Sequence, residues 1–163
     1  ESLRLGLSAV GPGRAVVVLE GDVVFEPDLL RAFLGGRRAT ATIAAPYRPE
    51  LTGTFLTAGA DGTVTDWVHE RVRPAGFPLQ ASFKSVNVTY FAPEDVARSL
   101  RPSLARCLAE DGPAAPLEFA LRRAVVDDRL AIAAFDPGPH GWFEVDTPDD
   151  LRLAEAIFAA RRG

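Results

Sequence analysis

Two short stretches of the sequence carry carboxylates that could bind a metal ion. Asp22 follows directly on the apolar run at residues 15–19. Glu144 and Asp146 are two residues apart in another apolar segment, and on a strand this spacing puts both carboxylates on one face. Carboxylate oxygens are hard ligands that suit Mg²⁺. These positions favour a metal site, while the alternatives are a capped strand-end turn at Asp22 and a solvated strand edge at Glu144 and Asp146.

Lys84 is the only lysine of the chain and lies in a strand-like segment at residues 82–91. Alternation along a strand places Ser85 and Asn87 on one face and Lys84 on the other. An ammonium group is a suitable point charge for a phosphate. A lysine on a strand is also a common device against association at a sheet edge. The residue pattern leaves both interpretations of Lys84 open.

An α/β scaffold is expected to bring these side chains together. The run at 15–19 is typical of a strand buried on both faces in a parallel sheet. The patterns predict further strands at 39–45, 54–57, 63–67, 82–91, 130–135 and 142–145, and helices at 27–34, 93–108, 116–127 and from residue 148 onward. Their alternation, with a hairpin at 54–67, indicates a layered α/β domain with a mixed sheet.

Composition narrows the class of protein. A chain of 163 residues is most simply one domain, and a net charge of −4 argues against general attraction to nucleic acid. The single cysteine, Cys107, excludes an internal disulfide and favours a reducing compartment. No apolar run approaches the roughly 20 residues that span a bilayer. We therefore expect a cytoplasmic protein without membrane or nucleic-acid partners.

Three segments, in this order and spacing, resemble the sugar-1-phosphate nucleotidyltransferase-type superfamily. They read GDVVFEP at 21–27, KSVNV at 84–88 and WFEVDTPDDL at 142–151. Within the superfamily, the best match is to the phosphocholine and 2-aminoethylphosphonate cytidylyltransferases. The resemblance covers nearly the whole chain and corresponds to the C-terminal two-thirds of such an enzyme. It implies a three-layer sandwich with a mixed, mostly parallel sheet, like that of the nucleotide-diphospho-sugar transferases.

The resemblance also implies catalytic roles for three residues. Asp22 and Asp146 match the family's two aspartates, which hold the Mg²⁺ that bridges the nucleotide α-phosphate and the incoming phosphate. Lys84 is implied to contact the phosphate of the substrate. The implied reaction is transfer of a nucleotidyl group, in the closest group a cytidylyl group from CTP, to a small phosphate or phosphonate, with release of pyrophosphate.

Three further residues are implied to bind the substrate. Asn87 is expected to order its strand or touch the ligand. Glu118 falls near the family's acidic helix position, and with Glu144 it is expected to face a substrate ammonium group. Such an acceptor carries both an anionic phosphorus group and a cationic nitrogen.

The sequence departs from the family at its beginning. Members open with a strand, a glycine-rich loop carrying an arginine, and a lysine, which together hold the nucleotide's phosphates. The glycine-bearing segment at 6–14 precedes its strand and so does not match that loop. We therefore expect 1–163 to be a partial domain, with the N-terminal nucleotide-loop segment absent, completed by upstream residues, a separate polypeptide or a second copy.

Two other functions remain open from the sequence. One is a metal-dependent glycosyltransferase, which typically carries an Asp-x-Asp pair where this chain has Glu20-Gly21-Asp22. The other is a non-catalytic binding or regulatory module of the same fold. Detecting pyrophosphate, a nucleoside diphosphate or no product distinguishes the three.

Overall fold

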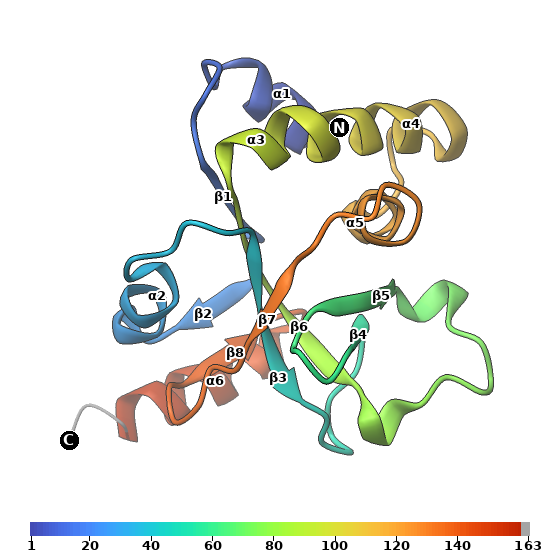
Figure 1. Cartoon of the computed structure of the whole chain (residues 1–163). Helices are drawn as coiled ribbons and strands as arrows, with labels where there is room; N and C mark the ends of the chain where they lie inside the picture. Colours follow the sequence, from blue (N-terminus) through green and yellow to red (C-terminus); the bar gives the residue numbers. More distant parts are fainter. Residues whose placement is uncertain (161–163) are drawn as a thin grey trace.

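The computed structural model describes residues 1–160 as a sheet flanked by helices (Figure 1). The strands are β1 (Val16–Leu19), β2 (Val23–Phe25), β3 (Ala41–Pro46), β4 (Phe55–Ala58), β5 (Val64–Val68), β6 (Phe83–Phe91), β7 (Ala133–Phe135) and β8 (Trp142–Glu144). The helices are α1 (Ser2–Ser8), α2 (Pro27–Leu34), α3 (Pro93–Asp95), α4 (Arg101–Asp111), α5 (Leu117–Val126) and α6 (Pro148–Ala160). A π-helical turn at Val96–Leu100 joins α3 to α4, and 3₁₀ turns lie at Glu70–Val72 and Leu79–Ala81. All the strands and helices expected above are present, with ends that differ by up to three residues.

Strand β6 is the centre of the main sheet. The strands follow the order β5-β4-β6-β3-β7, and β1 pairs with the second half of β6. β6 is antiparallel to β1, β3 and β4, and among the described strands only β3 and β7 pair in parallel. The expected mixed sheet is confirmed, whereas the expectation of a mostly parallel one is wrong. The run of β1 packs against both hydrophobic clusters, but Val16, Val17 and Val18 are only half-buried and Leu19 is 43% exposed, so the expectation of a strand buried on both faces is also wrong.

Two hydrophobic clusters lie on opposite faces of this sheet. In β3, Ile43 belongs to the cluster that contains Leu29 and Phe33 of α2. The next residue, Ala44, belongs to the cluster that contains residues of α1, α4 and α5. Successive side chains of a strand point to opposite faces, so α2 covers one face and α1, α4 and α5 cover the second, as Figure 1 shows. The expected three-layer α/β arrangement is confirmed.

A separate two-stranded ladder joins the beginning of the chain to its end. In it, β2 is antiparallel to β8, with Val23 opposite Glu144 and Phe25 opposite Trp142. Backbone bonds continue the ladder at both ends, from Val145 N–H to Asp22 O at 2.8 Å and from Glu26 N–H to Gly141 O at 2.9 Å. The strand β2 was not expected, because three residues are too few for a recognisable alternation and their partner is distant in sequence.

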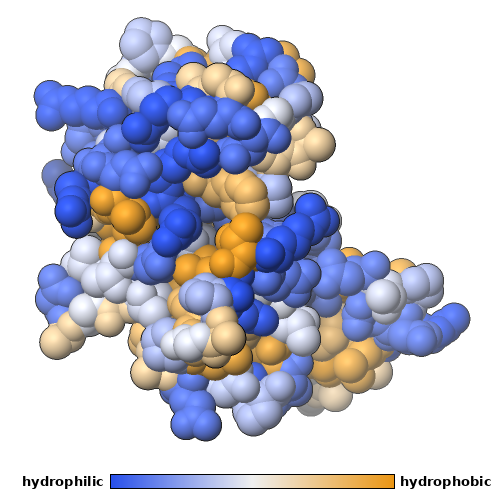
Figure 2. All heavy atoms as spheres, turned by 90° about the vertical axis from the view of Figure 1, so that its right-hand side faces the viewer, coloured by the Kyte–Doolittle hydropathy of each residue, from blue (hydrophilic) through white to orange (hydrophobic). Residues whose placement is uncertain are grey.

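The outer surface is mostly polar. Seen from the side that carries α5 and β5, hydrophilic side chains cover most of the molecule, and hydrophobic ones gather in a band across the middle (Figure 2). Within residues 1–160, no helix combines the length and apolar character that crossing a membrane requires.

Helix α6 begins with a reciprocal cap that fixes the end of β8. The Asp150 carboxylate accepts hydrogen bonds from the backbone N–H groups of Thr147 at 2.8 Å and Asp146 at 3.2 Å. In return, the Asp150 N–H donates to the Thr147 hydroxyl at 3.2 Å. This arrangement satisfies donors that a helix N-terminus otherwise leaves unpaired. Thr147 is thus the N-cap of α6, and the cap holds the backbone of Asp146.

Removing this cap should destabilise the chain measurably. We expect Asp150→Ala to lower the free energy of unfolding by about 1 kcal/mol, the usual cost of a lost N-terminal cap. Asp149→Ala is the matched control, because it removes an equal charge from the same turn and loses only a surface ion pair with Arg152. Urea denaturation measures both variants. Equal destabilisation by the two would contradict the assigned cap.

Candidate active site

Lys84 is buried in the middle of the main sheet. It lies on β6 between Ala45 of β3 and Phe55 of β4. Its side chain is only 2% exposed, and its Nζ lies 2.8 Å from Oε2 of Glu144. A lysine with paired strands on both sides does not protect a sheet edge. The edge-strand interpretation of Lys84 is therefore wrong.

Asn87 interrupts the regular geometry of β6. Its backbone is left-handed, with φ 61°, a conformation that asparagine tolerates better than most residues. The pairing with β3 moves from Ser85↔Ala44 to Thr89↔Thr42, four residues of β6 against two of β3. Such a bulge re-aims side chains, and here Asn87 Nδ2 donates to Oε1 of Glu144 at 2.8 Å. Strict alternation would keep Asn87 and Lys84 on opposite faces of β6. Both side chains contact Glu144, so the alternation does not hold at this point.

Both carboxylate oxygens of Glu144 are therefore engaged within the chain. Lys84 takes one oxygen and Asn87 the other. These contacts connect β8 of the small ladder to β6 of the main sheet. The glutamate expected to face a substrate ammonium is, in this structure, neutralised by the ammonium of Lys84.

Asp22 and Asp146 are brought together by the β2–β8 ladder. Asp22 precedes β2, and its carbonyl accepts the bond from Val145 N–H, one residue before Asp146. The capped start of α6 then holds the backbone of Asp146. Both aspartates are solvent-exposed and line one cavity. Their proximity thus follows from backbone pairing between distant segments.

Glu118 reaches the same cavity from the first turn of α5. Its Oε1 accepts a hydrogen bond from the hydroxyl of Thr54 at 2.9 Å. Thr54 lies just before β4, and its carbonyl accepts a bond from Ser85 N–H at 3.1 Å. The position of this carboxylate is therefore set by the central sheet as well as by its own helix.

The six residues singled out from the sequence all line one cavity of about 240 Å³. Its lining consists of Glu20, Asp22, Thr52, Gly53, Thr54, His69, Glu70, Lys84, Asn87, Glu118, Glu144 and Asp146. We call this cavity the acidic cleft, because its lining has six carboxylates and a single lysine. Carboxylates at this density repel one another, so the cleft is suited to hold cations.

Glu20 is the main residue that the sequence interpretation missed. The pKa of Glu20 is raised to about 7, chiefly by burial and also by the neighbouring carboxylates of Glu118, Asp22 and Glu144, while Lys84 acts in the opposite direction. Its backbone N–H donates to the carbonyl of Asn87 at 3.2 Å. The available signal was its place two residues before Asp22, at the end of the same apolar run.

His69 and the Thr52–Thr54 segment were also missed. His69 Nδ1 accepts a hydrogen bond from Arg71 N–H at 3.1 Å, and its ring packs edge-on against Phe119 at 5.9 Å between centroids. Thr52, Gly53 and Thr54 form a wall of the acidic cleft. Neither segment stands out in the sequence, because loop residues acquire such positions only through the tertiary fold.

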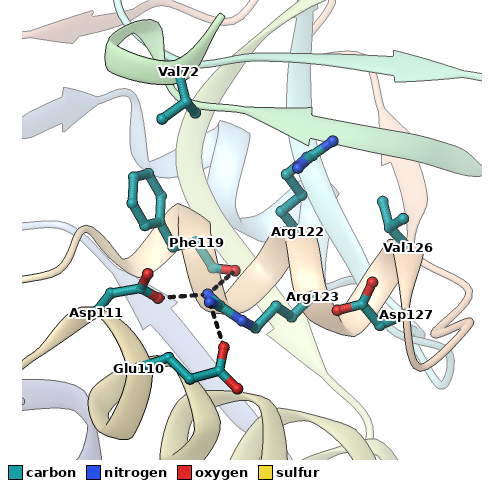
Figure 3. A pocket seen from close by; sticks show the side chains of 8 residues that line it. All are labelled: Val72, Glu110, Asp111, Phe119, Arg122, Arg123, Val126 and Asp127. Carbon is teal, nitrogen blue, oxygen red and sulfur yellow. Dashed lines mark hydrogen bonds and ion pairs between the residues drawn. The ribbon is translucent and has the colours of Figure 1, made fainter.

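A second pocket, of about 370 Å³, lies over α5 and shares no lining residue with the acidic cleft. Figure 3 shows that one of its two arginines, Arg123, is paired with carboxylates of the same pocket. Arg123 contacts Glu110 at 2.8 Å, Asp111 at 2.7 Å and the carbonyl of Phe119 at 3.4 Å. Arg122 is paired with Asp66, outside the pocket lining. Both arginines of this pocket therefore already have carboxylate partners within the chain.

The fold is similar to that of solved nucleotidyltransferases. The inositol-1-phosphate CTP transferase from T. maritima matches with a TM-score of 0.65 and 18% identity, over 94% of this chain and 58% of the transferase. The CTP:phosphocholine cytidylyltransferase from Streptococcus pneumoniae matches with a TM-score of 0.67 and 16% identity, over 96% of this chain and 62% of that enzyme. At these identities the likeness establishes the fold.

A curated relative narrows the resemblance. The CMP-5'-(3-aminopropyl)phosphonate synthase from Streptomyces rubellomurinus is 33% identical over 151 residues. The match covers 90% of this chain and 23% of the synthase, so the chain spans less than a quarter of the relative's length. No protein-family model matches the chain. Together, these comparisons confirm the resemblance to nucleotidyltransferases of the cytidylyltransferase type.

The raised pKa of Glu20 predicts how stability depends on pH. The folded chain keeps the Glu20 proton up to about pH 7, whereas an unfolded glutamate loses it near pH 4.5. The folded state therefore binds more protons between these values, and stability falls as pH rises through that window. We expect Glu20→Gln to flatten the fall and to raise the melting temperature at pH 8 by roughly 2–4 °C, the effect of about 1 kcal/mol in a domain of this size.

Thermal melts from pH 5 to pH 8, recorded in EDTA, measure this effect. Glu50→Gln is the control, because Glu50 is an exposed carboxylate that pairs only on the surface with Arg48. Parallel pH profiles for the original chain and Glu20→Gln would show that Glu20 does not carry the effect.

Proposed function

We propose that the complete protein is a Mg²⁺-dependent cytidylyltransferase that transfers CMP from CTP to a small phosphonate or phosphate bearing an ammonium group. The observation that carries the proposal is the gathering of Asp22, Lys84, Glu118 and Asp146 in one cleft. The relative named for CMP-5'-(3-aminopropyl)phosphonate synthesis supports both the nucleotide and the acceptor class.

The two aspartates fit a magnesium ion by their chemistry. Among residues 1–160 there is no group of three or more Asp, Glu, His or Cys side chains arranged to hold a metal. Mg²⁺ usually takes one or two protein carboxylates and completes its octahedron with water and substrate phosphates. Asp22 and Asp146, exposed on adjoining positions of the ladder, match that requirement. When bound, the ion would neutralise charge on the reacting phosphoryl oxygens.

The reaction brings two anions together. An acceptor oxygen forms a bond to the α-phosphorus of CTP while the bond from that phosphorus to the bridging oxygen breaks, and pyrophosphate leaves with the bonding electrons. Lys84 would orient the acceptor's phosphonate, since its ammonium has three donors and Glu144 uses one of them. Glu144 and Asn87 hold Lys84 in place, so the cation is positioned before the substrate arrives.

The carboxylates of Glu118 and Glu20 are the groups best placed to bind the acceptor's ammonium. Glu144 is already paired with Lys84. Glu118 hydrogen-bonds a neutral hydroxyl and forms no ion pair among the described residues. Glu20 lines the same cleft and is affected most, among its charged neighbours, by Glu118. A cation between these two carboxylates would relieve their mutual repulsion.

Replacing the aspartates should abolish turnover without unfolding the protein. In the complete protein with CTP, (3-aminopropyl)phosphonate and Mg²⁺, we expect Asp22→Asn and Asp146→Asn to reduce pyrophosphate release at least about 100-fold. EDTA should have the same effect. Asp149→Asn, an exposed carboxylate three residues from Asp146, should retain activity.

The products separate this proposal from its rivals. Release of a nucleoside diphosphate from a nucleoside-diphosphate sugar, without release of pyrophosphate from CTP, would indicate a glycosyltransferase, for which Glu20 and Asp22 in one cleft supply an acid-x-acid pair. Binding of CTP without any turnover would indicate a non-catalytic module.

The role of Glu118 predicts a selective loss. We expect Glu118→Gln to raise the KM for (3-aminopropyl)phosphonate roughly tenfold or more, since a hydrogen bond to a charged group contributes about 1.5–3 kcal/mol. The KM for propylphosphonate, which lacks the amine, should stay unchanged. Steady-state kinetics with both acceptors measures the difference. An equal change for both acceptors would place the ammonium elsewhere.

A further inference from the structure

Gly53 lies against the ammonium group of Lys84. Its backbone has φ 83°, in the left-handed region that favours glycine. A Cβ built at Gly53 would lie 3.2 Å from Lys84 Nζ and 3.9 Å from its Cε. The shorter distance is tighter than ordinary van der Waals contact. The absence of a side chain at Gly53 therefore leaves the space that the ammonium occupies.

Lys84 has little freedom to move away from Gly53. It is 2% exposed, in the central strand of the sheet. Its Nζ is also held by Glu144 at 2.8 Å. A side chain at Gly53 would therefore displace the ammonium from Glu144 or push it along the cleft.

The Gly53 segment is itself fixed by polar contacts. The Gly53 carbonyl accepts a hydrogen bond from Arg73 Nη1 at 3.0 Å, and the Arg73 guanidinium lies 5.2 Å from the centroid of the Phe55 ring. The next residue, Thr54, is bonded through its carbonyl to Ser85 and through its hydroxyl to Glu118. The wall of the cleft is thus fixed at Gly53 and at Thr54, which limits its movement away from Lys84.

We infer that Gly53 is a positioning residue, which sets where the Lys84 ammonium stands and acts through it on the acceptor's phosphonate. The second half of this inference rests on the proposed function. The neighbouring Thr54 orients Glu118, so one short segment positions the cleft's lysine and one of its carboxylates. Gly53 itself offers the substrate no side chain.

The unique lysine makes the inference testable without turnover. In the chain labelled with ¹³C,¹⁵N-lysine, Lys84 gives the only lysine side-chain signals. We expect Gly53→Ala to shift its Cε and Nζ resonances. Gly62→Ala is the matched control, because Gly62 has nearly the same backbone, φ 78°, but an added Cβ there meets nothing within 4 Å. Coincident lysine signals in Gly53→Ala and the original chain would overturn the inference.

A second variant covers the case in which Gly53→Ala does not fold. Arg73→Gln removes the bond to the Gly53 carbonyl without adding atoms beside Lys84. We expect it to loosen the wall and to raise the rate at which an N-hydroxysuccinimide ester acylates Lys84, read by peptide mass spectrometry. An unchanged rate would show that the Gly53 wall does not hold the lysine.

Kinetics of the complete protein test the second half of the inference. We expect Gly53→Ala to raise the KM for (3-aminopropyl)phosphonate while the KM for CTP stays constant, because the displaced ammonium would no longer match the position of the acceptor's phosphonate. Unchanged acceptor kinetics despite shifted lysine signals would overturn this half. If the unaltered protein shows no turnover, the proposed function fails, whereas the lysine signals still decide the role of Gly53.

Discussion

The contact between Lys84 and Glu144 is the constraint on which the site depends. A buried ammonium is costly unless a partner compensates its charge, and removing one partner of a buried pair leaves the other uncompensated. Glu144 meets this need only because β8 is brought against β6, and Asn87 satisfies its remaining oxygen. The left-handed turn of β6 and the bare backbone of Gly53 both serve this one pair.

The clustered carboxylates of the acidic cleft lower the stability of the folded chain. Within residues 1–160, most of its carboxylates lack an ionic partner, and burial together with their mutual repulsion raises the pKa of Glu20 to about 7. Clustered like charges are tolerated where a ligand compensates them, and perturbed titration is common at functional sites. The pocket over α5 shows the opposite arrangement, with its arginines paired internally. The arginines of the pocket over α5 have carboxylate partners within the chain, whereas the carboxylates of the acidic cleft require cations from a ligand.

The sequence predicted the layers of the fold better than the directions of its strands. Apolar periodicity placed β6, α2 and α5 within a few residues, because burial of one face is a local property of the chain. It did not predict the antiparallel neighbours of β6, nor the three-residue strand β2, since both depend on pairing between distant segments. Strand pairing is set by tertiary contacts that a local pattern does not contain.

The site residues also fall into those that a local sequence pattern identifies and those that only the tertiary fold reveals. Asp22, Lys84 and Asp146 were recognised by motif, and the cleft contains all three. Glu20, His69 and Gly53 were missed, because their importance arises from what the fold places beside them. Glu144 was recognised as a site residue, but its contacts with Lys84 and Asn87 depend on tertiary packing that the sequence pattern does not contain.

The β2–β8 ladder also determines when the cleft can exist. Its strands lie about 120 positions apart in the sequence, so closing this loop carries a large entropic cost before any contact compensates it. During synthesis β2 emerges long before β8, so Asp22 and Asp146 come together only after nearly the whole chain has been made. Local elements such as the β4–β5 hairpin have no such delay. A ligand that needs both aspartates therefore binds only chains that have finished folding, and it selectively stabilises them.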